Sequence, residues 1–241
     1  KWLLLVWLAG LGSVAILRWG GVLGLSPIDN RRWGGLPLTL ILATFGIGLA
    51  FPLGVLLALG RRSNMPAIKA LCVVYIEIIR GVPLISLLFM SSVMLPLFLP
   101  EGVTIDKLLR AQIAIILFTA AYIAETVRGG LQAIPKGQIE GAESLGLTYW
   151  QQMYKIVLPQ ALKIVIPPMV SIFIALFKDT SLVVVIGIYD LTLSAKAALA
   201  DPLWQGFSVE AYLFISLIYF VFCFAMSRYA KNLEARLGTG Y

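Results

Sequence analysis

The amino-acid sequence predicts an all-α polytopic membrane protein with about six transmembrane helices. Apolar residues make up 60% of the 241 residues and charged residues only 13%, about half of the fraction that soluble domains carry. One core cannot hide so much apolar surface, so lipid must cover much of it. The basic residues lie at the ends of long apolar runs, as they do in helices that cross a bilayer.

The first three spans follow from the lengths of the apolar runs, since a crossing needs about 20 residues. The run 2–17 is short and could also be a signal-peptide core, but no convincing cleavage site follows it; Lys1 is not a methionine, and we expect a further segment before it. The run 36–60 ends at two arginines. The run 67–99 is too long for one crossing at about 1.5 Å per residue, so we expect 82–99 to cross and 67–81 to begin at or below the membrane surface.

Three further apolar runs complete the six, at residues 111–127, 164–189 and 211–226. If the spans alternate from an inside N-terminus, eleven of the 19 basic residues lie inside and six outside. This bias predicts that both termini are cytoplasmic. We therefore expect residues 1–35 to be an N-terminal transmembrane helix with a periplasmic segment. Residues 36–241 would form the main transmembrane domain, with a cytoplasmic loop at 135–163.

The polar interruption at residues 138–159 separates the fourth and fifth spans. Pro135 should end the preceding helix, Glu140 suits the N-terminus of a short helix, and Gly146 suits its left-handed C-terminal cap. A compact helix, turn and helix should result. Aromatic and aliphatic side chains would then be available as anchors for a protein partner, namely Leu145, Leu147, Trp150, Met153 and Tyr154.

This interruption resembles the EAA loop of ATP-binding-cassette importer permeases. The family pattern is EAA, three residues, Gly, nine residues, Ile, one residue and Leu-Pro, and every spacing agrees; Gly141 stands where alanine is usual. The resemblance implies that the segment couples the permease to an ATPase. It implies the following coupling residues: Glu140, Gly141, Ala142, Leu145, Gly146, Leu147, Ile156, Leu158 and Pro159.

Three further segments are similar to the polar amino-acid branch of that family, and among its members to the broad-range general amino-acid permeases. These segments are EIIRGVPL at 77–84, YIAETVRGG at 122–130 and FKDTSL at 177–182. The resemblance implies type I importer architecture in the bacterial inner membrane and import of acidic and neutral amino acids. It also implies a cytoplasmic ATPase dimer, a related second permease rather than a second copy, and a periplasmic amino-acid-binding protein. The chain has no phosphate-binding GxxxxGK[ST] loop, so ATP and Mg²⁺ would be bound by the partner and this chain would not be an enzyme.

The substrate pathway is less constrained by the sequence. Lys178 and Asp179 interrupt a long uncharged stretch, where charges are costly unless they face a cavity or a partner. Together with Thr180 and Ser181 they could bind an amino acid's carboxylate and ammonium, or they could form a polar network that holds a permease dimer together. Hydroxyl groups in other spans could face the pore or bond to neighbouring helices: Thr39, Thr44 and Tyr122.

A structural role is expected for two charged pairs spaced i, i+3 and for a helix break. Glu77 and Arg80 should form a salt bridge, with substrate contact as the alternative, and Arg128 beside Glu125 should anchor the inner interface. Gly81 and Pro83 should break the helix between them.

Other classes fit the residues less well. An ion-coupled secondary amino-acid carrier is the alternative, but no internal repeat is evident. No histidine and no CxxC pair are present, which argues against a metal site and against most membrane-embedded enzymes. The basic residues form no patch suited to nucleic acid.

Overall fold

The computed structural model describes residues 34–238, and the side chains of residues 34–235. The all-α prediction is confirmed: the described residues form helices and turns, with one isolated bridge between Gly35 and Asp190. The expected first span, 2–17, lies outside them. The helices are α2 (Leu36–Arg61), α3 (Pro66–Gly81), α4 (Leu84–Phe89), α5 (Lys107–Ala133), α6 (Lys136–Ser144), α7 (Tyr149–Gln152), α8 (Leu158–Asp179), α9 (Leu191–Ala198) and α10 (Ser208–Gly238).

Four helical segments of the described chain are long and apolar enough to cross a membrane. A fifth follows if the bent pair Pro66–Gly81 and Leu84–Phe98 is one span. The four continuous segments are Leu36–Arg61, Lys107–Ala133, Tyr149–Ile186 and Ser208–Ala235.

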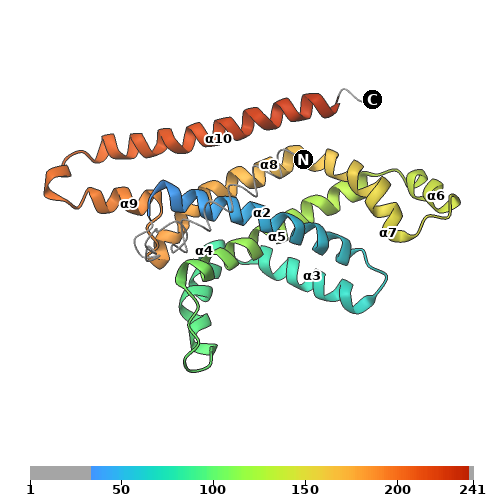
Figure 1. The fold of residues 1–241 in the computed structure, drawn as a ribbon, viewed down its shortest axis with the longest axis horizontal. Coiled ribbons are helices and arrows are strands. Elements are labelled where there is room, and N and C mark those ends of the chain that lie inside the picture. The colour runs from blue at the N-terminus through green and yellow to red at the C-terminus, as the bar shows by residue number, and fades with distance from the viewer. Residues whose placement is uncertain (1–33, 239–241) are drawn as a thin grey trace, which may run out of the picture.

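Helices α2, α5 and α8 pack together at the centre, and α3 lies against α2 and α5 (Figure 1). Small residues permit this close approach. A Cβ at Gly54 would lie 2.5 Å from Ile123 Cγ2, and one at Gly130 would lie 2.4 Å from Val165 Cγ1. Both glycines therefore set the spacing between neighbouring helices.

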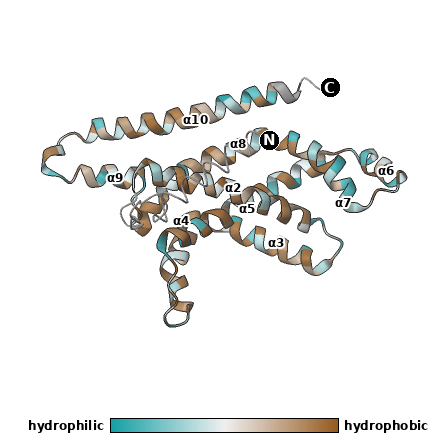
Figure 2. Cartoon of the chain, viewed as in Figure 1, coloured by the Kyte–Doolittle hydropathy of each residue, from teal (hydrophilic) through white to brown (hydrophobic). Residues whose placement is uncertain are grey.

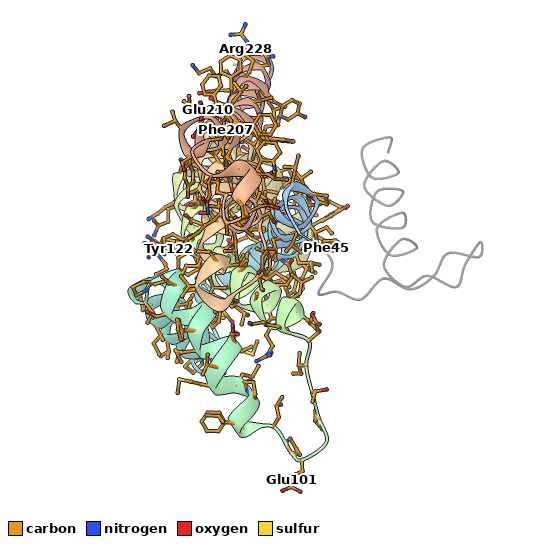
Figure 3. All side chains as sticks on the ribbon, turned by 90° about the vertical axis from the view of Figure 1, so that its left-hand side faces the viewer. Phe45, Glu101, Tyr122, Phe207, Glu210 and Arg228 are labelled. Carbon is orange, nitrogen blue, oxygen red and sulfur yellow. The ribbon has the colours of Figure 1, made fainter. Side chains whose placement is uncertain are left out.

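The segment 82–99, which is expected to cross the membrane by itself, is the second half of a bent helix pair in the structure. Helix α3 ends at Gly81, Val82 is extended, and α4 then runs at 103° to α3. The cause is Pro83, which has no amide hydrogen and disfavours helical geometry at the residue before it. Beyond α4 the helix continues as π-helical Met90–Met94 and 3₁₀-helical Leu95–Phe98, and Figure 3 shows this arm leading away from the bundle to a loop that carries Glu101.

The fifth span also differs from its predicted bounds of 164–189. It is continuous from Tyr149 through a π-helical segment, Met153–Val157, into α8. Helix α8 ends at Asp179, a 3₁₀ helix follows over Thr180–Ile186, and Gly187 turns the chain with φ of 68°. Lys178 and Asp179 therefore lie at the end of an α-helix and not in its middle.

Helix α10 lies alongside the bundle with little of its surface covered. Only 6% of its apolar span is buried within the chain, and it packs mainly on α8 and α9. Figure 2 shows its largely hydrophobic colouring. The exposed side chains include Leu213, Phe214, Leu217, Phe220 and Phe224, so α10 presents an apolar surface to lipid or to another membrane helix.

Candidate functional site

The polar interruption folds as predicted into two short helices, α6 and α7, at one end of the bundle (Figure 1). Helix α5 ends at Ala133, and Pro135 starts α6 with extended backbone geometry. The expectation that Glu140 occupies the helix N-terminus is wrong. Helix α6 begins at Lys136, so Glu140 lies in its middle, where its carbonyl accepts a hydrogen bond of 2.9 Å from Ser144 Oγ.

Gly146 caps α6 in the left-handed conformation, as predicted, with φ of 70°. Its amide donates to the Glu143 carbonyl at 2.8 Å, and the Leu147 amide donates to the Ala142 carbonyl at 3.2 Å. These two bonds are those of a Schellman motif, which satisfies the last carbonyls of a helix. Gly146 of the EAA-loop pattern therefore occupies a left-handed cap position that a residue with a side chain would adopt only with backbone strain.

The turn after Gly146 is also held by side chains. Gln151 Oε1 accepts a bond of 2.9 Å from the Thr148 amide at the start of α7. Gln152 Nε2 donates to the Leu147 carbonyl at 2.8 Å. The two short helices are thus fixed relative to each other by local hydrogen bonds.

Three of the five predicted anchors project from this element. Leu145, Trp150 and Tyr154 are 78%, 67% and 79% exposed. Leu147 is half-buried, and Met153 is buried in the core, so the prediction that Met153 is available for contact is wrong. Large apolar side chains on an otherwise polar tip indicate a surface that another protein covers.

The remaining residues of the EAA-loop pattern connect this tip to the membrane-spanning core. Ala142 is buried, Ile156 and Leu158 are half-buried, and Pro159 stands in the first turn of α8. Gln160 Nε2 donates to Gln138 Oε1 at 3.2 Å and so joins α8 to α6. A force on α6 would therefore reach α8.

Near the same end, five charged side chains form an ion-pair cluster across α2, α3 and α5. Glu125 contacts Arg61 at 3.2 Å, Arg80 at 3.8 Å, and Arg128 by a close hydrogen bond. The predicted pairing of Glu77 with Arg80 is wrong: Glu77 pairs with Arg61 at 2.9 Å. Glu125 and Arg128, spaced i, i+3, do pair within α5, and the role of Arg128 as an anchor at the inner interface stays a prediction. The cluster joins three helices because Arg61, at the end of α2, supplies the charge that both carboxylates share.

Arg80 also lies over an aromatic ring. Its guanidinium carbon is 5.6 Å from the centre of the Tyr122 ring, a distance at which cation–π attraction is significant. The Tyr122 ring packs in turn on Phe118, with centroids 4.9 Å apart. Figure 3 shows Tyr122 on the face of the bundle opposite Phe45.

Two of the predicted substrate-pathway residues, Thr39 and Thr180, lie beside the same side chain, that of Tyr219 on α10, whereas Tyr122 lies beside Arg80. Lys178 is exposed and Asp179 is half-buried; Thr180 is buried and its hydroxyl donates to the Phe177 carbonyl at 2.8 Å. The Thr39 hydroxyl donates to the Gly35 carbonyl at 3.3 Å and accepts from the Leu191 amide at 3.1 Å. The bond to Leu191 holds the start of α9 against α2. Ser181 and Thr44 are half-buried.

One cavity was not predicted from the sequence. It has a volume of about 950 Å³ and lies at the end of the bundle opposite α6 and α7. Its lining consists of Leu38, residues 104–108, Arg110 and residues 187–189, and none of the predicted substrate-pathway residues is part of it. Its cationic side chains, Lys107 and Arg110, share one face of α5 through i, i+3 spacing, but only the tertiary fold brings 187–189 beside them.

The fold and the tip together define a polytopic membrane protein whose helix bundle carries two short helices with exposed apolar side chains at one end. Residues 50–239 match the family described as the binding-protein-dependent transport system inner membrane component. Two curated relatives are similar over nearly the whole chain. The inner membrane amino-acid ABC transporter permease protein YhdY of Escherichia coli is 59% identical over 93% of this chain and 61% of the relative.

The second relative is the glutamate/glutamine/aspartate/asparagine transport system permease protein BztC of Rhodobacter capsulatus, 48% identical over 97% of this chain and 54% of the relative. The chain thus spans between half and two thirds of the length of these relatives. A solved structure, the crystal structure of an amino acid ABC transporter with histidines, superposes with a TM-score of 0.73 at 34% identity, over 84% of this chain and 92% of the other. This chain belongs to the family of inner-membrane permease components of binding-protein-dependent transport systems, and to its ATP-binding-cassette amino-acid branch.

Proposed function

We propose that this chain is the transmembrane permease subunit of an ATP-driven importer that moves acidic and neutral amino acids into the bacterial cytoplasm. The observation that carries the proposal is the tip formed by α6 and α7: a Schellman-capped helix with Leu145, Trp150 and Tyr154 exposed around it. A rigid surface with several exposed apolar side chains suits the binding of a partner protein that would move the bundle. The amino acids named for BztC support the substrate class.

The orientation and the partners follow from this assignment. The tip would lie in the cytoplasm, together with both termini, against a dimer of ATPase subunits that bind ATP and Mg²⁺. A periplasmic amino-acid-binding protein would deliver the substrate from the other side. The uncovered apolar surface of α10 is in keeping with a second permease subunit, and the resemblance favours a related chain over a second copy.

The geometry suggests how a movement of the ATPases would be transmitted. The helical segment from Tyr149 to Ile186 is continuous, so displacement of the tip would tilt α8 along its whole length. The ion-pair cluster around Glu125 joins α2, α3 and α5 near the same end, so these helices would follow as a unit. Rocking of helices about a central site is the motion that alternating access requires.

For the substrate pathway we propose the cluster Lys178 to Ser181, with Thr39, Thr44 and Tyr122 as further polar groups along the route. Asp179 supports it: the carboxylate is half-buried at the end of α8, and none of the ion pairs among residues 34–235 involves it. Asp179→Asn should change substrate-stimulated ATP hydrolysis while the complex stays assembled. An unchanged response to substrate would remove Asp179 from the pathway.

A co-purification experiment tests the assignment itself. The wild-type chain should retain an ATPase through purification, and Gly146→Arg should lose it, because arginine strains the left-handed cap and adds bulk to the docking surface. Gly102→Arg is the matched control: Gly102 also has positive φ and open space around it, but it lies in the loop beside Glu101. Retention of the ATPase by Gly146→Arg would contradict the docking assignment. Uptake into vesicles without any ATPase would instead favour an ion-coupled carrier.

A further inference from the structure

The cavity of about 950 Å³ at the start of α5 is built from three segments that are far apart in the chain. Leu38 comes from the first turn of α2, residues 104–108 and Arg110 from the loop before α5 and its first turn, and residues 187–189 from the turn before α9. We call this cavity the α5 vestibule. Its volume is within the range of small-molecule sites in proteins, and its lining segments lie at the end of the bundle remote from the α6–α7 tip (Figure 1).

The charge within the α5 vestibule is predominantly positive. Lys107 and Arg110 line it, and Asp106 is the carboxylate among its lining residues. Asp106 Oδ1 accepts hydrogen bonds from the Leu108 and Leu109 amides, at 2.9 and 3.3 Å, and so caps α5. A concave site with cationic walls raises the local concentration of anions.

The two cations keep hydrogen-bonding capacity for a ligand. None of the ion pairs within residues 34–235 involves Lys107 or Arg110. One Arg110 Nη donates to the Ser92 carbonyl, which fixes the guanidinium, while its buried Nε has no partner among the described residues. Lys107 Nζ would lie 3.5 Å from a Cβ at Gly187, so the ammonium group reaches across to the opposite wall.

We infer that the α5 vestibule receives anionic substrates, and that Lys107 and Arg110 bind the side-chain carboxylate of an acidic amino acid before it enters the membrane interior. The inference rests on the proposed function and adds the residues that favour acidic over neutral substrates. An arginine held in place and a lysine with a flexible stem, on one helix face, are suited to binding a carboxylate. The planar guanidinium offers paired hydrogen-bond donors that match the two carboxylate oxygens, and the ammonium group adds a point charge. A neutral amino acid has no side-chain carboxylate, so it lacks the additional ion pairs that this second carboxylate makes with Lys107 and Arg110.

The test compares glutamate with glutamine, which have nearly the same shape but differ in side-chain charge. The complex that co-purifies with this chain is reconstituted in proteoliposomes. Initial ATP-dependent uptake is measured at saturating liganded binding protein, so that the preference of the binding protein is the same for every variant. Lys107→Gln should lower the uptake of glutamate relative to glutamine by about fivefold, the upper range for the loss of one exposed ion pair. Lys107→Glu should lower it further, and Lys107→Arg should preserve it.

Lys196→Gln is the matched control, because Lys196 is exposed on α9 at the same end of the bundle but does not line the vestibule. Lys196→Gln should leave the ratio of glutamate uptake to glutamine uptake unchanged. Arg110→Lys keeps the positive charge but loses the paired hydrogen-bond donors of the guanidinium. It should reduce glutamate uptake in a complex whose assembly is verified by gel filtration.

The outcomes separate the two proposals. If the wild-type complex imports no amino acid, the proposed function fails, and the inference fails with it. If it imports both substrates but Lys107→Gln and Lys107→Glu leave the ratio unchanged or slow both equally, the inference alone is overturned; Lys107 would then serve as a contact for lipid headgroups or for the binding protein. Import of glutamine without glutamate by the wild type would also overturn it.

Discussion

Two glycines five residues apart in the α6–α7 tip should respond in opposite directions to the same substitution. An added Cβ would meet no atom within 4 Å at either Gly141 or Gly146, so packing does not distinguish them. Gly146, however, has φ of 70°, whereas Gly141 lies within α6. The effects of alanine at these positions should therefore come from the backbone alone.

The magnitudes follow from the two conformations. Alanine in the left-handed region costs about 1–2 kcal/mol, so Gly146→Ala should weaken the cap by that amount. Alanine within a helix is favoured over glycine by about 1 kcal/mol, so Gly141→Ala should stabilise α6 and would also restore the alanine usual in the EAA pattern. Because about 1.4 kcal/mol corresponds to a factor of ten, local opening of α6 should rise about five- to thirtyfold in the first variant and fall about fivefold in the second.

Hydrogen exchange of the amides in residues 136–147 of the purified transporter measures this local opening. Asparagine tolerates the left-handed conformation better than alanine does, so Gly146→Asn should give a smaller increase than Gly146→Ala. Unchanged exchange in Gly146→Ala, or faster exchange in Gly141→Ala, would refute the assignment of these two glycines to a cap and a helix interior.

Two further predictions concern the stability of the bundle, measured as the midpoint of thermal unfolding of the purified complex. Glu125→Gln should destabilise the folded bundle by about 2 kcal/mol, because the carboxylate is only 21% exposed and its loss leaves three arginines with one acid. The control Glu101→Gln, in an exposed loop, should not change the midpoint. Equal midpoints for the two variants would exclude the ion-pair cluster as a stabilising feature. Gly130→Ala should destabilise by about 1–3 kcal/mol, since its Cβ would lie 2.8 Å from the Ala161 carbonyl oxygen as well as against Val165. Gly129→Ala, with nothing within 4 Å, should be neutral or slightly stabilising, and a loss of stability there as large as that at Gly130 would contradict the close α5–α8 contact.

The long helices could be predicted from the sequence because an uninterrupted apolar run determines them locally. The second span was expected at 36–60 and is α2, Leu36–Arg61; the fourth was expected at 111–127 and is the middle of α5. The cap at Gly146 was predicted for a similar reason, since a Schellman motif depends on residues within one turn. In both cases the decisive interactions lie within a few residues of each other.

Features that depend on contacts between distant segments were missed. Glu77 was paired with Arg80 because they share a helix face, but Arg61 approaches from α2 and binds Glu77 at 2.9 Å. The α5 vestibule was missed because residues 187–189 reach the start of α5 only after the 3₁₀ segment turns at Gly187. The division between α3 and α4, by contrast, was predicted, because Gly81 and Pro83 mark it within a few residues: α3 ends at Gly81 and α4 begins at Leu84.

The sparse contacts of α10 have a consequence for the order of folding during synthesis. The central packing of α2, α5 and α8 can form before α10 emerges, because α10 follows these helices in the chain and adds little to their core. Segments of a growing chain generally fold as they become available. The nascent bundle should therefore reach a protease-resistant state first and acquire α10 as a late addition.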